Sequence, residues 1–284
     1  MGIIIRRKNS LVKTNIFFRV FLWIYFVISL YPLVWMVFYS LKNNDEIFIT
    51  NPFGFPTHFR IENYITAMKT FNIPSYFINS IIVSVFTVLG TVVLSLLFAY
   101  AAARMEWKLK NIARMYMIMG LFIPISVILI PLSRLLRDMH IANSYLAMII
   151  PYIAINMSFA VLVFYGFLRS IPFELEESAY IDGANVYRTF YSIIVPIIKP
   201  AISTVIIFIF LQAWNEFTFA YNLISNEAIK TLPLGLLFFQ GQFTTNWGAM
   251  GACMTIASFP MVIIYIFFSE QVERAMTVGA AVKG

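Results

Sequence analysis

The sequence is poor in charged residues and in the residue types that most enzymes use for catalysis. Charged side chains make up only 12% of the 284 residues, whereas a soluble domain usually carries about 25%, so there is too little polar surface to cover a water-soluble globule. The single cysteine, Cys253, excludes an intrachain disulfide and any paired-cysteine metal motif. His58 and His140 are the only histidines, so a histidine-based catalytic site is not expected.

Nucleotide-binding and metal-binding motifs are also missing. No Gly-Lys pair is followed by Ser or Thr, which excludes the phosphate-cradling loop of P-loop ATPases, and no His-Glu-x-x-His pattern occurs. We therefore expect no cofactor and no metal on this chain, and any linked ATP hydrolysis belongs to another polypeptide. The formal charge of +7 does not indicate nucleic-acid binding, because the basic residues cluster in short loops between apolar runs.

Apolar residues are abundant and are arranged in long runs. They make up 61% of the chain, and several runs reach the roughly 20 residues that a helix needs to cross a bilayer. The sequence predicts an all-α integral membrane protein, with one transmembrane domain over residues 1–284. Its six helices are expected at about 16–41, 76–103, 115–132, 144–168, 197–223 and 248–268. Prolines inside these runs are expected to kink the helices: Pro32, Pro124, Pro131, Pro151 and Pro260.

The basic residues predict the orientation in the membrane. Arg6, Arg7 and Lys8 precede the first run, which is too long for a signal-peptide core and is expected to stay as an uncleaved span. With both termini in the cytoplasm, the inner segments hold roughly twice as many Lys and Arg residues as the outer ones, which agrees with the positive-inside rule. The loop over residues 169–199 is then cytoplasmic.

That loop contains a polar island between two apolar runs, from Ile171 to Pro200. Four of the chain's 13 acidic residues lie here within nine positions: Glu174, Glu176, Glu177 and Asp182. Ser170 and Pro172 suit the start of a helix, Gly183 suits its end, and residues 184–195 suit a second helix. We expect helix, sharp turn and helix at the membrane surface. The residues alone suit a solvated connector, whose acids only cap a helix, as well as they suit a docking site.

Two features of the sequence, a loop pattern and the end of the chain, resemble the permease subunits of ABC importers. Glu177-Ser178-Ala179, Gly183 four residues later and Pro196 further on resemble their cytoplasmic "EAA" loop, with Ser178 where Ala is usual. The chain's end, residues 279–284, resembles the carbohydrate branch, and the closest likeness is to the second permease of maltose-type importers. Because serine is small, Ser178 in place of the usual alanine should not disturb packing.

The resemblance implies partners for the chain and roles for the loop residues. A second permease, a dimer of ATPase subunits with ATP and Mg²⁺, and an external solute-binding protein are expected around it, in a bacterial plasma membrane, with a sugar as substrate. Glu177 and Asp182 would contact the ATPase and Gly183 would form the turn. Ala179 and Ala184 would pack closely.

A second candidate site is the segment Trp214-Asn215-Glu216 near the end of the fifth predicted span. A carboxylate within a span is costly and is by default a functional hypothesis. Trp214 would stack on a sugar, and Asn215 and Glu216 would hydrogen-bond to hydroxyl groups or to the partner subunit. The alternative is a purely structural hydrogen bond at the subunit interface.

Two other classes of function remain open at this point. An ion-driven secondary transporter should have several charges buried in different spans and an inverted repeat, whereas Glu216 is the main candidate charge and no repeat is evident. A membrane-embedded enzyme should have clustered His, Asp or Glu near the bilayer surface, and the acidic loop is the only such cluster found. The importer is therefore the preferred hypothesis.

Overall fold

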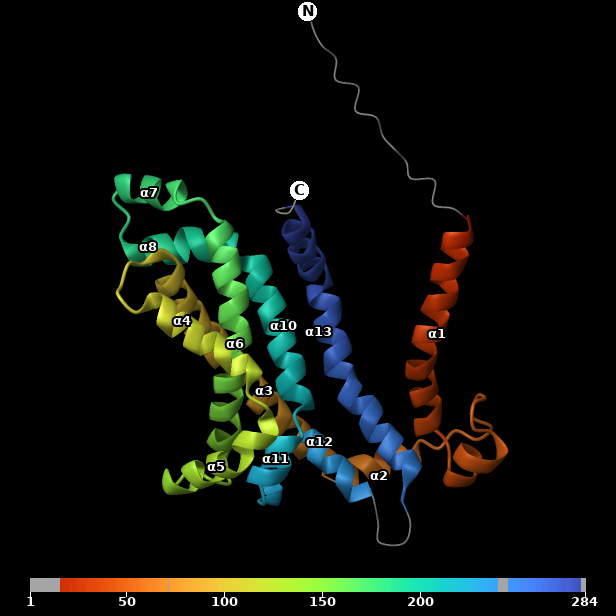
Figure 1. Ribbon diagram of the computed structural model, residues 1–284. Coiled ribbons are helices and arrows are strands. Elements are labelled where there is room, and N and C mark those ends of the chain that lie inside the picture. Colours follow the sequence, from red (N-terminus) through yellow and green to blue (C-terminus); the bar gives the residue numbers. More distant parts are fainter. Residues whose placement is uncertain (1–15, 71, 240–244, 282–284) are drawn as a thin grey trace, which may run out of the picture.

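The computed structural model describes residues 16–70, 72–239 and 245–281, and every regular element among them is helical (Figure 1). Four helices contain apolar stretches long enough to cross a membrane. They are α1 (Ile16–Ser40), α3 (Ile73–Arg104), α6 (Tyr145–Ser170) and α13 (Trp247–Ala281). They confirm the predicted helices at 16–41, 76–103, 144–168 and 248–268, although α13 continues well past residue 268.

The predicted helix at 115–132 is not continuous. Residues 110–122 form α4 (Lys110–Met119) and a short turn, η2 (Gly120–Phe122), and α5 (Ile125–Asp138) then leaves at an angle of 108°. Pro124 stands in the break, and the residue before it, Ile123, is extended because proline disfavours the helical conformation at the preceding residue. The expected kink at Pro124 is therefore a complete break, and Arg134 and Arg137, which follow the predicted span, lie within α5.

The predicted helix at 197–223 is also divided. Its main part is α10 (Lys199–Asn215), which is followed by a break at Glu216 and by α11 (Thr218–Leu223). Before it come α7 (Glu174–Ile181), α8 (Val186–Thr189), η3 (Phe190–Ile194) and α9 (Val195–Ile197). The segment Val186–Ile197 meets α10 at 74°. If each bent pair is one span, the described residues contain up to six candidate spans.

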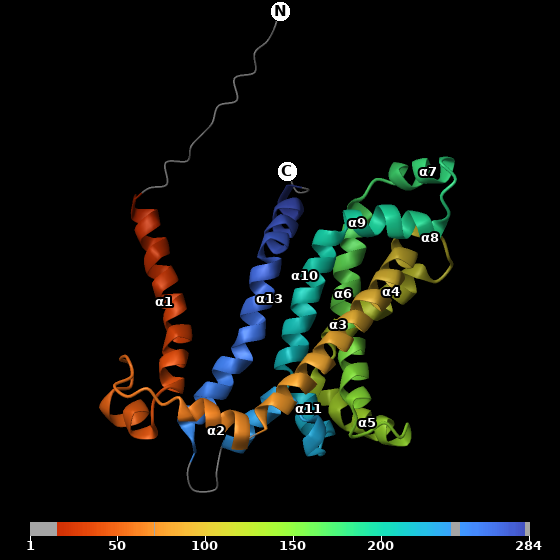
Figure 2. The same cartoon turned by 180° about the vertical axis from the view of Figure 1, so that it is seen from behind.

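The shorter elements lie at two ends of the bundle. They include η1 (Glu46–Thr50), α2 (Glu62–Thr70), η4 (Glu227–Ile229), α12 (Leu232–Gly235) and η5 (Leu236–Phe239). Figures 1 and 2 show α2, α5, α11 and α12 at one end, while α7 and α8 lie at the other, together with the start of α1 and the end of α13.

The core of the bundle is the packing of α3 against α6 and α10. Small hydroxyl residues on α3, all buried, recur every three or four positions: Ser80, Ser84, Thr87, Thr91 and Ser95. This spacing puts them on one face of the helix, and small side chains allow membrane helices to approach closely. By contrast, α1 stands apart and meets α13 near one end (Figure 2). In the most apolar stretch of α1, no residue is buried by the rest of the described chain.

Candidate functional site

The polar loop begins later than the sequence indicates. Ser170 is the last residue of α6, and its hydroxyl donates to the Phe167 carbonyl at 2.7 Å, so the prediction that it caps the next helix was wrong. Pro172 makes Ile171 extended, and α7 starts only at Glu174, after Phe173, without a side-chain cap. Three acids still lie in the first turn of α7, where the positive end of the helix dipole favours negative charge.

The end of α7 confirms the predicted turn. Gly183 has a φ of +79°, which side-chain-bearing residues adopt only with strain. The Gly183 N–H donates to the Tyr180 carbonyl at 3.0 Å and the Ala184 N–H donates to the Ala179 carbonyl at 2.9 Å. This pair of bonds is the Schellman motif, which ends a helix sharply at a glycine.

The second helix of the loop also forms as expected. The Asn185 side chain caps it by accepting a hydrogen bond from the Arg188 N–H at 2.9 Å. Helical structure then continues through Ile197, with π-type bonding over Phe190–Ile194. Pro196 lies just before the 74° bend into α10, where its missing N–H weakens the ladder. The Phe190 ring packs on Tyr100 of α3, 4.8 Å between centroids, which holds this helix against the bundle.

A buried ion pair fixes α7 to the end of α3. Glu176 is 4% exposed, and its Oε1 lies 3.0 Å from Nε of Arg104. Its other oxygen accepts a hydrogen bond from the Tyr100 hydroxyl at 2.9 Å. Arg104 also donates to the Ile171 carbonyl at 2.7 Å and stacks over the Phe173 ring, 4.3 Å from its centroid. The Arg104 guanidinium therefore fixes both α7 and the segment that leads into it.

Sequence reasoning counted Glu176 among the acids of the loop but assigned it no role of its own. The feature of the sequence that could have indicated its burial is the spacing of two residues. Glu176 and Ala179 are three residues apart, which places them on one face of a helix, and both are buried. Glu177 and Ser178 point the other way and are exposed. The division between a buried face and an exposed face was thus present in the sequence, although the partner Arg104 was not identifiable from it.

The exposed part of the loop combines acids with large apolar side chains. Of the predicted contact residues, Glu177, Ser178, Asp182, Gly183 and Pro196 are exposed, Ala184 is half-buried and Ala179 is buried. Beside them, Ile181 is 86% exposed. Other exposed apolar and aromatic residues here are Leu175, Tyr180, Val186, Tyr187 and Tyr191. We call the exposed residues of 174–191 the loop surface.

The three residues of the second candidate site lie in different environments. Trp214 is 2% exposed, its N–H donates to the Ala257 carbonyl at 3.0 Å, and its ring packs edge-on against Phe77 of α3 at 5.5 Å between centroids. Asn215 is exposed and donates to the Leu211 carbonyl at 2.9 Å. Asn215 also borders a mainly apolar hollow of about 370 Å³ between α10, α12 and α13.

Glu216 bonds within its own chain. Its carboxylate accepts hydrogen bonds from the backbone N–H groups of Phe219 at 2.8 Å and Ala220 at 3.2 Å, and from the Tyr152 hydroxyl of α6. It therefore caps the start of α11 and ties it to α6. This cap explains why the fifth predicted span is interrupted, since a helix that starts anew needs partners for its first N–H groups.

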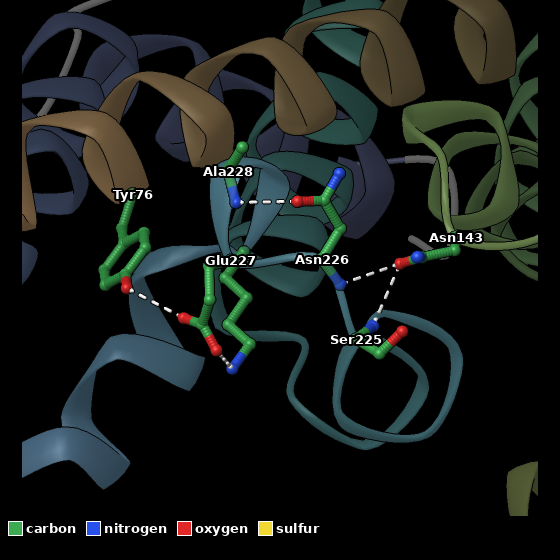
Figure 3. A network of polar contacts seen from close by, with 7 residues as sticks. Tyr76, Asn143, Ser225, Asn226, Glu227 and Ala228 are labelled. Carbon is green, nitrogen blue, oxygen red and sulfur yellow. Dashed lines mark hydrogen bonds and ion pairs between the residues drawn. The ribbon is translucent and has the colours of Figure 1, made fainter.

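A further polar network lies at the opposite end of the bundle from α7 (Figure 3). The Asn143 side chain accepts hydrogen bonds from the backbone N–H groups of Ser225 at 3.0 Å and Asn226 at 2.9 Å. The Tyr76 hydroxyl donates to Glu227 at 3.3 Å, and Glu227 pairs with Lys230. The network holds the connection after α11 against the starts of α3 and α6. It was not predicted, because its members are far apart in the sequence.

An apolar helical bundle with a polar loop anchored across one end has the architecture of a multi-span membrane protein. Residues 92–278 match the family described as "Binding-protein-dependent transport system inner membrane component". The chain belongs to this family of ABC-transporter permeases, which are non-catalytic membrane subunits, and it is a multi-pass protein of the bacterial plasma membrane.

Individual relatives cover nearly the whole chain. The probable ABC transporter permease YurM of Bacillus subtilis is 35% identical over 279 residues, which cover 98% of this chain and 91% of that protein. The trehalose/maltose permease MalG of Thermococcus litoralis is 30% identical over 89% of this chain and 92% of its own. The diacetylchitobiose permease NgcG of Streptomyces coelicolor is 30% identical over 89% and 84%, respectively.

The fold is shared with a solved structure. The crystal structure of a bacterial ABC transporter involved in the import of the acidic polysaccharide alginate contains a chain with a TM-score of 0.79 to this one. That likeness covers 90% of this chain and 95% of the other, at 19% sequence identity. At this identity the match shows the fold alone.

Proposed function

We propose that the chain forms half of the translocation path of a sugar or oligosaccharide importer and is coupled through residues 171–200 to a separate ATPase. The observation that carries the coupling is the loop surface, which exposes acids and large apolar side chains on a helix that the Arg104–Glu176 pair anchors. An exposed Ile181 with acids around it is typical of a protein interface. The sugar class follows from relatives named for diacetylchitobiose and for trehalose/maltose.

The topology proposed for this function has six spans, with each bent helix pair counted as one. The start of α1, the end of α13 and the loop surface lie at the same end of the bundle (Figure 1), as an even number of crossings requires. The excess of basic residues in the segments expected at this end supports a cytoplasmic location for it. An ATPase dimer there, with its own ATP and Mg²⁺, can reach the loop surface. The second permease and the external solute-binding protein complete the assembly.

Coupling requires that a movement of the ATPase reach the spans. Because Glu176 binds Arg104 and Tyr100 of α3, and Phe190 packs on Tyr100, a displacement of the loop moves α3. The loop also continues into α10 through the bend after Ile197. Both α3 and α10 belong to the bundle core. A displacement of the loop therefore favours one of two packing arrangements of the bundle over the other, as a transport switch requires.

For the translocation path, the exposed Asn215 is the member of the second candidate site that is placed to meet a solute. Its amide borders the hollow between α10, α12 and α13. Trp214 also borders this hollow but is buried in the core, and Glu216 caps α11. An ion-driven carrier has less support, because the carboxylate of Glu216 is already held by two backbone N–H groups and a tyrosine.

The decisive experiment is purification of the tagged chain from its native membrane in mild detergent, with identification of every accompanying polypeptide. A second permease and a P-loop ATPase are expected, with the ATPase lost after Glu177→Lys on the exposed face. A chain that purifies alone and moves solute in liposomes without ATP would support the secondary transporter instead.

A further inference from the structure

The connection after α1 folds back along that helix. After Ser40 ends α1, the π-helical turn η1 and the irregular segment 51–57 turn back beside the end of that helix (Figure 1), and we call residues 46–57 the hairpin. The Trp35 indole N–H donates to the Pro52 carbonyl at 2.8 Å, and the Tyr31 hydroxyl donates to the Phe53 carbonyl at 3.1 Å. The hairpin is therefore not simply a cap beyond the helix end.

The distance that the hairpin covers along α1 follows from helix geometry. Tyr31 lies nine positions before Ser40, which is about 13 Å at 1.5 Å per residue, and helical side chains lean toward the N-terminus rather than the C-terminus. With 25 residues, α1 is about 37 Å long, against a hydrocarbon thickness of about 30 Å. Even if all the excess extended beyond the bilayer at this end, the Phe53 carbonyl would still lie below the hydrocarbon boundary.

The polar backbone of the hairpin is hydrogen-bonded as the bilayer interior requires. Five consecutive carbonyls, those of residues 51–55, each accept a hydrogen bond from a side chain. Besides Trp35 and Tyr31, Lys42 donates to the carbonyls of residues 51 and 54 at 2.6 and 2.7 Å, and the Asn51 amide donates to that of residue 55 at 2.7 Å. In water these carbonyls would need no such donors, whereas in lipid every unsatisfied backbone group is costly.

Of the three charged residues at positions 42–57, Lys42 and Glu46 face inward, whereas Asp45, which lies just before the hairpin, is exposed. Lys42 is fully buried, and Glu46 is buried and accepts hydrogen bonds from the Thr57 N–H at 2.6 Å and the Thr57 hydroxyl at 3.0 Å. Between them and the hairpin's end, residues 47–56 contain no charged residue. Besides Thr50 and Thr57, the exposed side chains of the hairpin are large and apolar: Phe48, Ile49, Phe53 and Phe55. Two of them, Ile49 at 75% and Phe53 at 72%, are among the most exposed apolar side chains of this segment.

We propose that residues 46–57 form a re-entrant hairpin immersed in the lipid at this end of α1, with Phe48, Ile49, Phe53 and Phe55 in contact with acyl chains. Lipid is the occupant that explains the apolar outer face, the inward charges and the bonded carbonyls together, and the hairpin is continuous with an apolar helix that already faces outward. The inference goes beyond the proposed function and does not depend on the substrate.

The test is fluorescence quenching in the assembled transporter. A Phe53→Cys variant, in a Cys253→Ser background, is labelled with the environment-sensitive NBD fluorophore and purified with its accompanying subunits into lipid discs. Because Phe53 is exposed, the substitution should leave the fold intact. We expect blue-shifted NBD emission, a loss of fluorescence when the discs contain phosphatidylcholine with a doxyl group at carbon 5, and little loss with aqueous iodide.

The matched control is Lys69→Cys, an exposed position on α2 at the same end of the bundle. Its label should be quenched by iodide and not by the doxyl lipid. The proposal is overturned if the Phe53 label is quenched by iodide as strongly as the control, which would place the hairpin in water. It is equally overturned if neither quencher acts, because another subunit then covers the hairpin. Ile49→Cys repeats the test at a second exposed position.

Discussion

At the scale of single residues, neighbouring glutamates in α7 have opposite roles. Glu176 is buried against Arg104, whereas Glu177 is exposed on the loop surface. Removing one partner of a buried pair leaves an uncompensated charge, which typically costs about 3–5 kcal/mol. An exposed carboxylate contributes well under that. Substitutions at these two adjacent positions should therefore have different effects. A change at Glu176 should lower stability, whereas a change at Glu177 should weaken docking to the ATPase.

We expect Glu176→Gln to lower the unfolding temperature of the purified chain and to expose the loop to limited proteolysis. Glu177→Gln should leave both unchanged and weaken only the association with the ATPase. Replacing both members of the pair by Met, in Arg104→Met with Glu176→Met, should be milder than either single change, because no buried charge remains. Equal effects of the Glu176 and Glu177 variants on stability would contradict this assignment.

The glycine of the turn gives a second residue-level prediction. Among the described residues, no atom lies within 4 Å of where a Cβ on Gly183 would stand, so a substitution meets backbone strain and not crowding. Gly183→Val should cost about 1–2 kcal/mol in the left-handed conformation and uncouple ATP hydrolysis from transport. Gly183→Asn, which tolerates this conformation, should retain most of the coupling. Transport and stimulated ATPase activity of the two variants check the difference, and an unimpaired Val variant would refute the role of the turn.

At the scale of elements, the break between α10 and α11 depends on one side chain. Glu216 accepts hydrogen bonds from the first N–H groups of α11 and from Tyr152. We expect Glu216→Ala to cost about 1 kcal/mol of local stability, as for other caps, and to increase hydrogen exchange at residues 218–223. Asn215→Ala is the control, and it should leave exchange in α11 unchanged. A Glu216 variant with normal exchange and a raised KM for transport would assign the carboxylate to the solute instead.

At the scale of the whole molecule, the proposed topology predicts which positions each side of the membrane can reach. Ile181→Cys on the loop surface should react with a membrane-impermeant thiol reagent only in inside-out vesicles. Lys69→Cys on α2 should react only in right-side-out vesicles, since the two lie at opposite ends of the bundle. Labelling of both positions from the same side would overturn the six-span arrangement.

The sequence by itself determined the class of the protein, four of its long helices and the turn of its loop. Apolar runs of more than 20 residues permit little but membrane helices, and Asp182-Gly183 ends a helix through local backbone energetics. Identification of the loop rested on a short pattern around Glu177 and Gly183. Those features are local, so they can be read without knowing what packs beside them.

Only the tertiary structure decided the break in the fifth predicted span, the buried role of Glu176 and the burial of Trp214. Each depends on partners distant in the chain: Glu176 meets Arg104, 72 positions earlier, and Glu216 meets Tyr152, 64 positions earlier. A proline or a carboxylate in an apolar run is unfavourable wherever it is left without compensation, but whether it kinks, breaks or caps a helix depends on which donors and acceptors the fold brings to it.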